Sequence, residues 1–126
     1  MKKKKGVDGK LDEAWSLLVK LKAGMMCEYC GKTTYLNSHH IYSRSKRSTR
    51  WDVSNGICLC VGHHTFNSKF SAHKTPLEFM DWLLNKKGQA YIDRLRIKAN
   101  QTSKLHEFEK KILLDELNKE IELLKN

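Results

Sequence analysis

The sequence lacks any hydrophobic run long enough to cross a membrane, so we expect no membrane partner. Lys2 to Lys5 resemble the start of a secretory signal, but charged residues interrupt the apolar segment 11–21 that follows. Internal repeats are absent as well. These absences favour a cytoplasmic protein, in which paired cysteines bind metal more often than they form disulfides.

Apolar residues are also scarce. The chain has 126 residues, the usual length of one domain, with 40% hydrophobic and 30% charged residues. A core built from so few apolar side chains is small. We therefore expect metal ligation to contribute part of the folding free energy.

Positive charge is concentrated in one half of the chain. The net charge is +10, and residues 1–50 hold twelve Lys/Arg against four Asp/Glu. Residues 76–126 hold ten against nine and are nearly neutral. This asymmetry favours a surface for polyanions joined to a neutral scaffold, although charge alone also fits a protein that is merely basic.

The first half of the chain mixes helix and strand patterns. Residues 1–10 read as a flexible basic arm, and 11–22 as a helix with apolar residues at helical spacing. Residues 25–38 read as a β-hairpin, and 35–42 place His39 and His40 in or just after a strand. A polar loop at 43–50 precedes a second strand through Trp51, Val53, Ile57 and Leu59, interrupted by a turn at Asn55-Gly56.

The second half is predicted to be helical. A helix begins near Gly62 or His63 and continues to Phe70. The next begins with Thr75 as N-cap, Pro76 at its first position and Glu78 as capping-box partner, with Gly88 as an interruption. The last covers roughly residues 101–124.

Two ligand pairs predict a structural zinc site. Cys27-x-x-Cys30 and Cys60-x-x-His63 together supply four ligands of the kind that tetrahedral zinc prefers. Cys58 is a competing thiol, but only Cys60 has a histidine three residues on. We therefore expect zinc on Cys27, Cys30, Cys60 and His63, closing a loop that carries the other candidate residues.

The remaining histidines follow a recognisable order: His39-His40-Ile41, then Asn55-Gly56-Ile57, then His63-His64. Over residues 25–82 the chain resembles the HNH (ββα-metal) nucleases, specifically the small phage-type members with an added zinc knuckle. The resemblance implies a small α+β fold: a ββα-metal core with a zinc knuckle, flanked by N- and C-terminal helices. It also implies a nuclease domain at 11–95 and a host cell that is bacterial or phage-infected.

The C-terminal segment 96–126 carries no motif. We expect its helix to pack on the domain, which gives a monomer. A homodimer formed through the same helix stays open.

The resemblance assigns roles to the site residues. His40 is the general base, and His39 and His64 bind a catalytic metal on the opposite face of the strand. Asn55 braces the loop and orients His40 by hydrogen bonding. The third metal ligand is His73, with Asn67 as the alternative, because Ser68 occupies the position where many family members have His or Asn.

The implied activity is metal-dependent hydrolysis of DNA, leaving 5′-phosphate and 3′-hydroxyl ends. The catalytic metal is magnesium, manganese, nickel or zinc. We expect the polar loop to contact DNA phosphates, since it has no apolar residue and offers four cations: Arg44, Lys46, Arg47 and Arg50.

Two other functions compete with this one. A non-catalytic zinc-knuckle nucleic-acid-binding protein, for example in phage packaging or recombination, needs the zinc ligands but not His39, His40 or His64. An adaptor that binds proteins through its C-terminal helix explains neither the basic loop nor the histidines.

Overall fold

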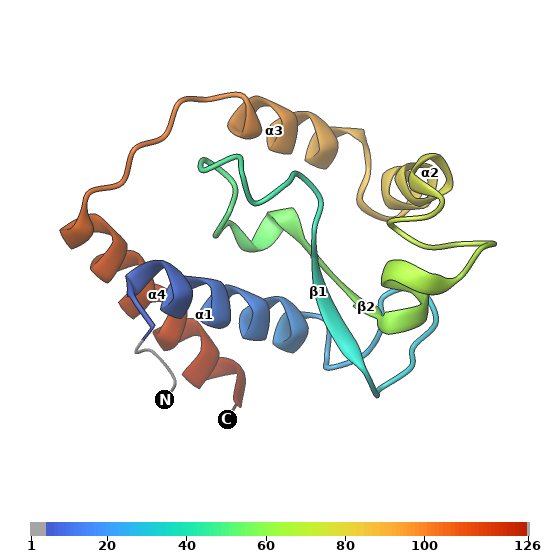
Figure 1. Cartoon of the computed structure of the whole chain (residues 1–126), viewed down its shortest axis with the longest axis horizontal. Helices are drawn as coiled ribbons and strands as arrows, with labels where there is room; N and C mark the ends of the chain where they lie inside the picture. The colour runs from blue at the N-terminus through green and yellow to red at the C-terminus, as the bar shows by residue number, and fades with distance from the viewer. Residues whose placement is uncertain (1–4, 126) are drawn as a thin grey trace.

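The architecture was obtained as a computed structural model, which describes residues 5–125. It is the small α+β fold expected from the sequence, with a two-stranded antiparallel sheet among helices (Figure 1). The elements in chain order are α1 (Val7–Lys22), β1 (Leu36–His40), the 3-10 turn η1 (Val53–Asn55), β2 (Gly56–Cys60), the π-helical turn η2 (Gly62–Phe66), α2 (Pro76–Lys87), α3 (Gln89–Ala99) and α4 (Glu107–Lys125).

The sheet lies at the centre, with α1 against one side and η2, α2 and α3 on the other (Figure 1). Alternation along β2 produces this division. Cys58 packs into the apolar cluster of α1 and α4, whereas Ile57 and Leu59 pack into that of α2 and α3. In the register of the sheet His39 is opposite Ile57 and His40 is opposite Gly56.

The hairpin predicted within residues 25–38 is wrong, because residues 27–32 form a tight turn and β1 pairs with β2 instead. The Gly31 amide donates to the Cys27 carbonyl at 2.8 Å, and the Cys27 amide donates to the Lys32 carbonyl at 2.8 Å. Gly31 has a φ of +79°, which glycine adopts without strain. These two bonds close the segment into a knuckle, and the Glu28 amide joins it to β2 by donating to the Cys58 carbonyl at 2.8 Å.

Three other predicted boundaries also move. Helix α1 begins at Val7, so Val7–Lys10 are not a flexible arm, and residues 1–4 of that arm lie outside the described part. Trp51 and Val53 lie before β2, in a turn and in η1. The segment after Cys60 ends at Phe66, since the Asn67 side chain accepts hydrogen bonds from the amides of Lys69 and Phe70.

The start of α2 at Pro76 and the break at Gly88, with a φ of +89°, confirm two predictions. The capping box does not form. Thr75 Oγ1 instead donates to the Ser71 carbonyl and accepts from the Ser71 amide, both at 2.9 Å. The loop before α2 is thereby closed on itself.

Helix α4 begins at Glu107 instead of residue 101, and it packs on α1 of the same chain through Leu117 and Ile121. Ion pairs join the two helices near both ends, Asp8 with Lys110 and Lys22 with Glu120. None of the helices formed by residues 5–125 combines the length and the apolar surface that a membrane-spanning helix needs.

Candidate functional site

The four predicted zinc ligands converge. The ligand atoms of Cys27, Cys30, Cys60 and His63 all lie within 4.8 Å of one another. Cys30 Sγ is 3.8 Å from Cys60 Sγ, which is 3.3 Å from His63 Nδ1. These four residues are therefore close enough to bind a metal such as zinc, whose ligand preferences they match.

Hydrogen bonds favour the thiolate of Cys27. Burial alone would raise the pKa of this thiol, but the backbone amides of Cys60, Cys30 and Tyr29 donate to it and lower the pKa. Because the thiolate is the form that binds metal, the fold prepares this sulfur for a cation.

Cys58 is excluded from the cluster, as the preference for Cys60 predicted. It is fully buried in the apolar cluster with Trp15 and Leu18. Burial, followed by the charge of Glu28, raises the pKa of the Cys58 thiol to about 11. A thiol in these surroundings is inert.

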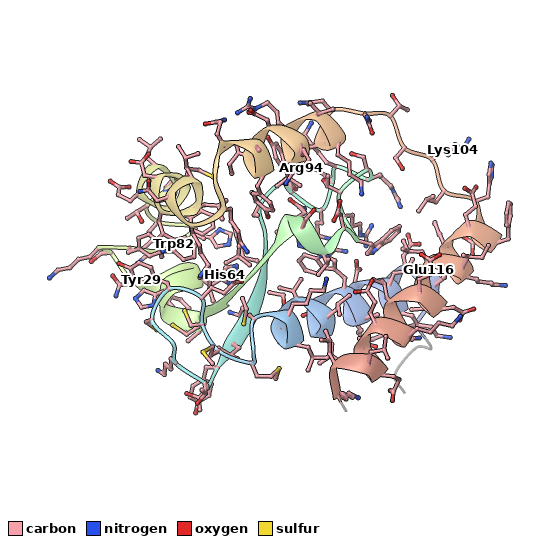
Figure 2. All side chains as sticks on the ribbon, turned by 180° about the vertical axis from the view of Figure 1, so that it is seen from behind. Tyr29, His64, Trp82, Arg94, Lys104 and Glu116 are labelled. Atoms are coloured by element: carbon pink, nitrogen blue, oxygen red, sulfur yellow. The ribbon has the colours of Figure 1, made fainter. Side chains whose placement is uncertain are left out.

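Aromatic contacts connect the first ligand pair to the second. Tyr29, between the two cysteines of the knuckle, stacks on Phe70 with ring centroids 3.8 Å apart. The edge contact between Tyr29 and His63 has a centroid distance of 4.7 Å. Tyr29, His64 and Trp82 gather at one end of the molecule, away from Lys104 and Glu116 (Figure 2). The knuckle is thus packed next to the turn that carries His63 and His64.

A second cluster consists of His39, His64 and His73, with ligand nitrogens also within 4.8 Å of one another. His64 Nε2 lies 3.1 Å from His39 Nδ1 and 3.1 Å from His73 Nε2. The residues come from β1, η2 and the loop before α2. The His73 amide donates to the His64 carbonyl at 3.1 Å, which brings this loop to η2.

Asn67, the alternative third ligand, has a different task. Its Oδ1 accepts from the amides of Lys69 at 2.8 Å and Phe70 at 3.1 Å. The oxygen that a metal would require is therefore used to end η2. The structure brings His73 to His39 and His64 instead.

His39 and His64 of this cluster are held neutral. Burial, and then repulsion from His64 and His73, lowers the pKa of His39 to about 3. Burial and the neighbouring His73 also lower the pKa of His64. Neutral imidazoles offer lone pairs, so this donor set can hold a divalent transition metal.

One residue that sequence reasoning missed is Asn37, whose side-chain Nδ2 lies 3.1 Å from His64 Nδ1. The oxygen and nitrogen of a side-chain amide exchange places when it turns by 180°. With the Asn37 oxygen facing His64, that oxygen accepts a hydrogen bond from a protonated Nδ1, and His64 Nε2 is left unprotonated for a metal. The signal was strand alternation, because Asn37 and His39 are two residues apart on one face of β1.

His40 lies on the opposite face of β1, as alternation predicted. Its Nε2–H donates to the Arg50 carbonyl at 2.9 Å, and a carbonyl can only accept. The neutral ring therefore carries its lone pair on Nδ1. Burial lowers the pKa of His40, so the ring is neutral near pH 7 and able to accept a proton.

Asn55 is fully buried and joins the ends of the loop that follows β1. Its Oδ1 accepts from the Tyr42 amide at 2.8 Å, and its Nδ2 donates to the carbonyls of Tyr42 and Thr49 at 3.0 and 3.1 Å. The loop is braced as expected. The expected direct bond from Asn55 to His40 is replaced by the one from His40 to Arg50, so Asn55 acts on His40 through the loop.

The basic loop differs from expectation at Arg50. Its side chain is 11% exposed and donates to both Asp12 oxygens, from Nε at 3.0 Å and Nη2 at 2.8 Å. Arg44 and Arg47 also face acids of α1, Asp12 and Asp8, each at 3.4 Å, but are 65% and 55% exposed. The expectation that this loop would contact only solvent or phosphate was therefore incomplete, because Asp8 and Asp12 of α1 form ion pairs with its arginines.

Comparisons with family models, curated proteins and solved structures found no match for this chain. The resemblance to the HNH nucleases therefore rests on the residues of this chain alone.

Proposed function

We propose that this protein is a metal-dependent DNA endonuclease of the HNH (ββα-metal) type. The observation that carries the proposal is the convergence of His39, His64 and His73 on one face of β1, together with a neutral His40 on the other face whose Nδ1 is unprotonated. A protein that only bound nucleic acid through its zinc knuckle would not need this second cluster of three imidazoles.

In this proposal His40 accepts a proton from the attacking water through Nδ1. Its neutral state near pH 7 and its fixed Nε2–H bond support the role of general base. Asn55 holds the loop whose Arg50 carbonyl receives that bond.

The three-histidine cluster would hold one divalent cation. Such a metal supplies positive charge that stabilises the phosphate and the leaving 3′ oxygen in the transition state. His39 and His64 offer half-buried, neutral nitrogens, and His73 completes the set from the more exposed side. Hydrolysis then leaves 5′-phosphate and 3′-hydroxyl ends.

The Cys27, Cys30, Cys60 and His63 cluster would hold a structural zinc. This cluster joins the knuckle at 27–30 to the end of β2, and His63 is adjacent to His64. Zinc would therefore fix the turn η2 that carries a catalytic ligand. Bond formation at this site would contribute to stability, not to the chemical step.

DNA would be held by the exposed cations of the loop at 43–50. Arg44 and Arg47 keep more than half of their side-chain surface exposed, and Lys46 is exposed as well. Guanidinium and ammonium groups beside the base suit phosphate contacts. Arg50 is left out of this set because Asp12 occupies its guanidinium.

The deciding experiment is plasmid cleavage by the wild type and by His40→Ala, with magnesium, manganese, nickel or zinc added in turn. The wild type should nick or linearise the plasmid with at least one metal, and His40→Ala should not. His106→Ala is the matched control, because His106 is exposed just before α4 and remote in sequence from both clusters. If the wild type binds DNA but never cleaves it, a non-catalytic zinc-knuckle nucleic-acid-binding protein becomes the better account.

A further inference from the structure

We propose that Trp15 and Asp12, two residues of α1, are positioning residues for His40. This inference rests on the proposed role of His40 as the base, and it extends the site beyond the segment that resembles the HNH nucleases. Helix α1 would hold the His40 imidazole in two ways. Trp15 stacks on the face of the ring, and Asp12 fixes the segment whose carbonyl accepts the hydrogen bond from Nε2 at the edge of the ring.

Trp15 holds the face. The His40 ring lies on the Trp15 indole with centroids 3.8 Å apart and an angle of 9° between planes. The indole cannot move easily, since it is 2% exposed and its Nε1–H donates to the Asp52 carbonyl at 2.7 Å. One side of the imidazole is therefore set against a rigid surface.

Gly56 makes room for this contact. It lies opposite His40 in the sheet, and a Cβ at this position would come within 2.9 Å of Trp15 Cζ2 and 2.3 Å of Val19 Cγ2. Its φ of −122° is open to any residue, so the glycine is needed for space alone. Because Gly56 has no side chain, the Trp15 indole can reach across β2 to His40 on the neighbouring strand β1.

Asp12 holds the edge, acting through Arg50. Its two oxygens receive Arg50 Nε and Nη2, and Oδ1 also accepts from Trp51 Nε1 at 2.8 Å. Residues 50 and 51 are thereby tied to α1. The Arg50 carbonyl that receives His40 Nε2–H belongs to this fixed segment.

Stacking and the edge hydrogen bond restrict different motions. The indole prevents the imidazole from tilting, and the carbonyl prevents it from turning over to exchange Nδ1 and Nε2. A general base contributes fully only when its lone pair points along the path of the proton. Both contacts should therefore affect the turnover number more than substrate binding.

The test compares four variants with the wild type, at temperatures where each is folded. Trp15→Leu removes the flat ring, and Trp15→Phe keeps one. Asp12→Asn weakens the attachment of Arg50 at a partly exposed position. Leu117→Ala is the matched control, because Leu117 belongs to the same apolar cluster but lies on α4.

Two readouts are measured. The first is kcat and KM for plasmid cleavage. The second is the NMR shift of the His40 ring protons, assigned by comparison with His40→Gln. Stacking on an indole moves these signals upfield, and this readout does not depend on catalysis.

Trp15→Leu should lower kcat roughly tenfold, a fraction of what complete loss of a base costs, while KM stays within about twofold. The His40 signals should move downfield. Trp15→Phe should recover most of both effects, and Asp12→Asn should lower kcat several-fold. Leu117→Ala should reduce stability and leave kcat and the His40 signals as in the wild type.

Wild-type kcat in Trp15→Leu and Asp12→Asn would overturn the proposal, whether or not the His40 signals move. If Trp15→Leu does not fold, Asp12→Asn decides by the same criterion. If the wild type cleaves no DNA, the proposed function fails, and the NMR shifts then decide the positioning separately. Unmoved His40 signals in both variants would refute it.

Discussion

The imidazole of His40 lies flat on the indole of Trp15, with ring centroids 3.8 Å apart. These residues are on different elements, and only the packing of α1 on the sheet brings them together. The contact places a helix that carries no recognisable motif against the candidate base. Substitutions in the zinc ligands, the base, the loop cations and α1 should therefore have separable effects.

Removing a knuckle ligand should affect stability. Cys27→Ala should lose its zinc and lower the free energy of unfolding by more than about 4 kcal/mol, a loss typical of missing metal ligation. Zinc content by mass spectrometry and the melting temperature with and without chelator would measure this.

Cys58→Val is the control for that experiment, since Cys58 is buried outside the cluster. It should keep one zinc per chain. A Cys27→Ala protein with bound zinc and an unchanged melting temperature would refute the structural site.

Substitutions in the histidine cluster should distinguish the base from a metal ligand. His40→Ala should lower turnover by at least about a hundredfold while the affinity for the second metal stays close to wild type. His64→Ala should weaken that affinity, because His64 Nε2 lies within 3.1 Å of both neighbouring ligand nitrogens.

Metal affinity is best measured by calorimetry on protein that already holds its zinc. Equal loss of metal binding in His40→Ala and His64→Ala would make His40 a ligand. The roles would then have to be reassigned.

The exposed cations of the loop should account for part of the salt dependence of DNA binding. Replacing Arg44, Lys46 and Arg47 by Ala should reduce the slope of log K against log salt by about 0.9 for each phosphate that is no longer neutralised. The affinity should fall equally on all DNA sequences, because interactions with phosphate carry no sequence information.

Arg50→Ala serves as the contrast in this series. Its guanidinium is paired with Asp12, so the substitution should lower the melting temperature and leave the salt slope nearly unchanged. A triple variant with the wild-type slope would place the DNA elsewhere on the protein.

Asp12 should make stability depend on pH in the acid range. Burial would raise the pKa of this carboxyl, but hydrogen bonds from Arg50 and Trp51 and the charge of Arg50 outweigh it and lower the pKa below 3.8. Because the folded-state pKa is the lower one, the stabilisation is complete above about pH 4 to 5 and is lost as pH falls through the folded-state pKa.

Urea unfolding at several pH values would show this. Asp12→Asn should be less stable than the wild type at pH 6, and the difference should shrink below pH 4. Asp115→Asn, at an exposed position of α4, is the control and should follow the wild type at every pH. A difference for Asp12→Asn that is constant from pH 6 to pH 3 would contradict the assignment.

The sequence by itself determined the features that depend on local chemistry. Pro76 started α2 because its fixed φ suits the first turn of a helix, and Gly88 ended it at a φ that other residues avoid. The spacing of Cys27-x-x-Cys30 and Cys60-x-x-His63 identified four residues that lie close enough together to bind a metal, since the two residues of each pair can face one point.

Tertiary structure decided the features that depend on residues far apart in the chain. The segment at 25–38 was predicted to form a hairpin within itself. Backbone hydrogen bonds close residues 27–32 into a knuckle instead, and the end of the segment belongs to β1, which pairs with β2. Arg50 resembled its neighbours Arg44 and Arg47, yet only the placement of Asp12 on α1 gave it a partly buried ion pair. The contact of Trp15 with His40 needed the close approach of α1 to Gly56. Local spacing cannot encode such contacts, because they depend on how distant elements pack.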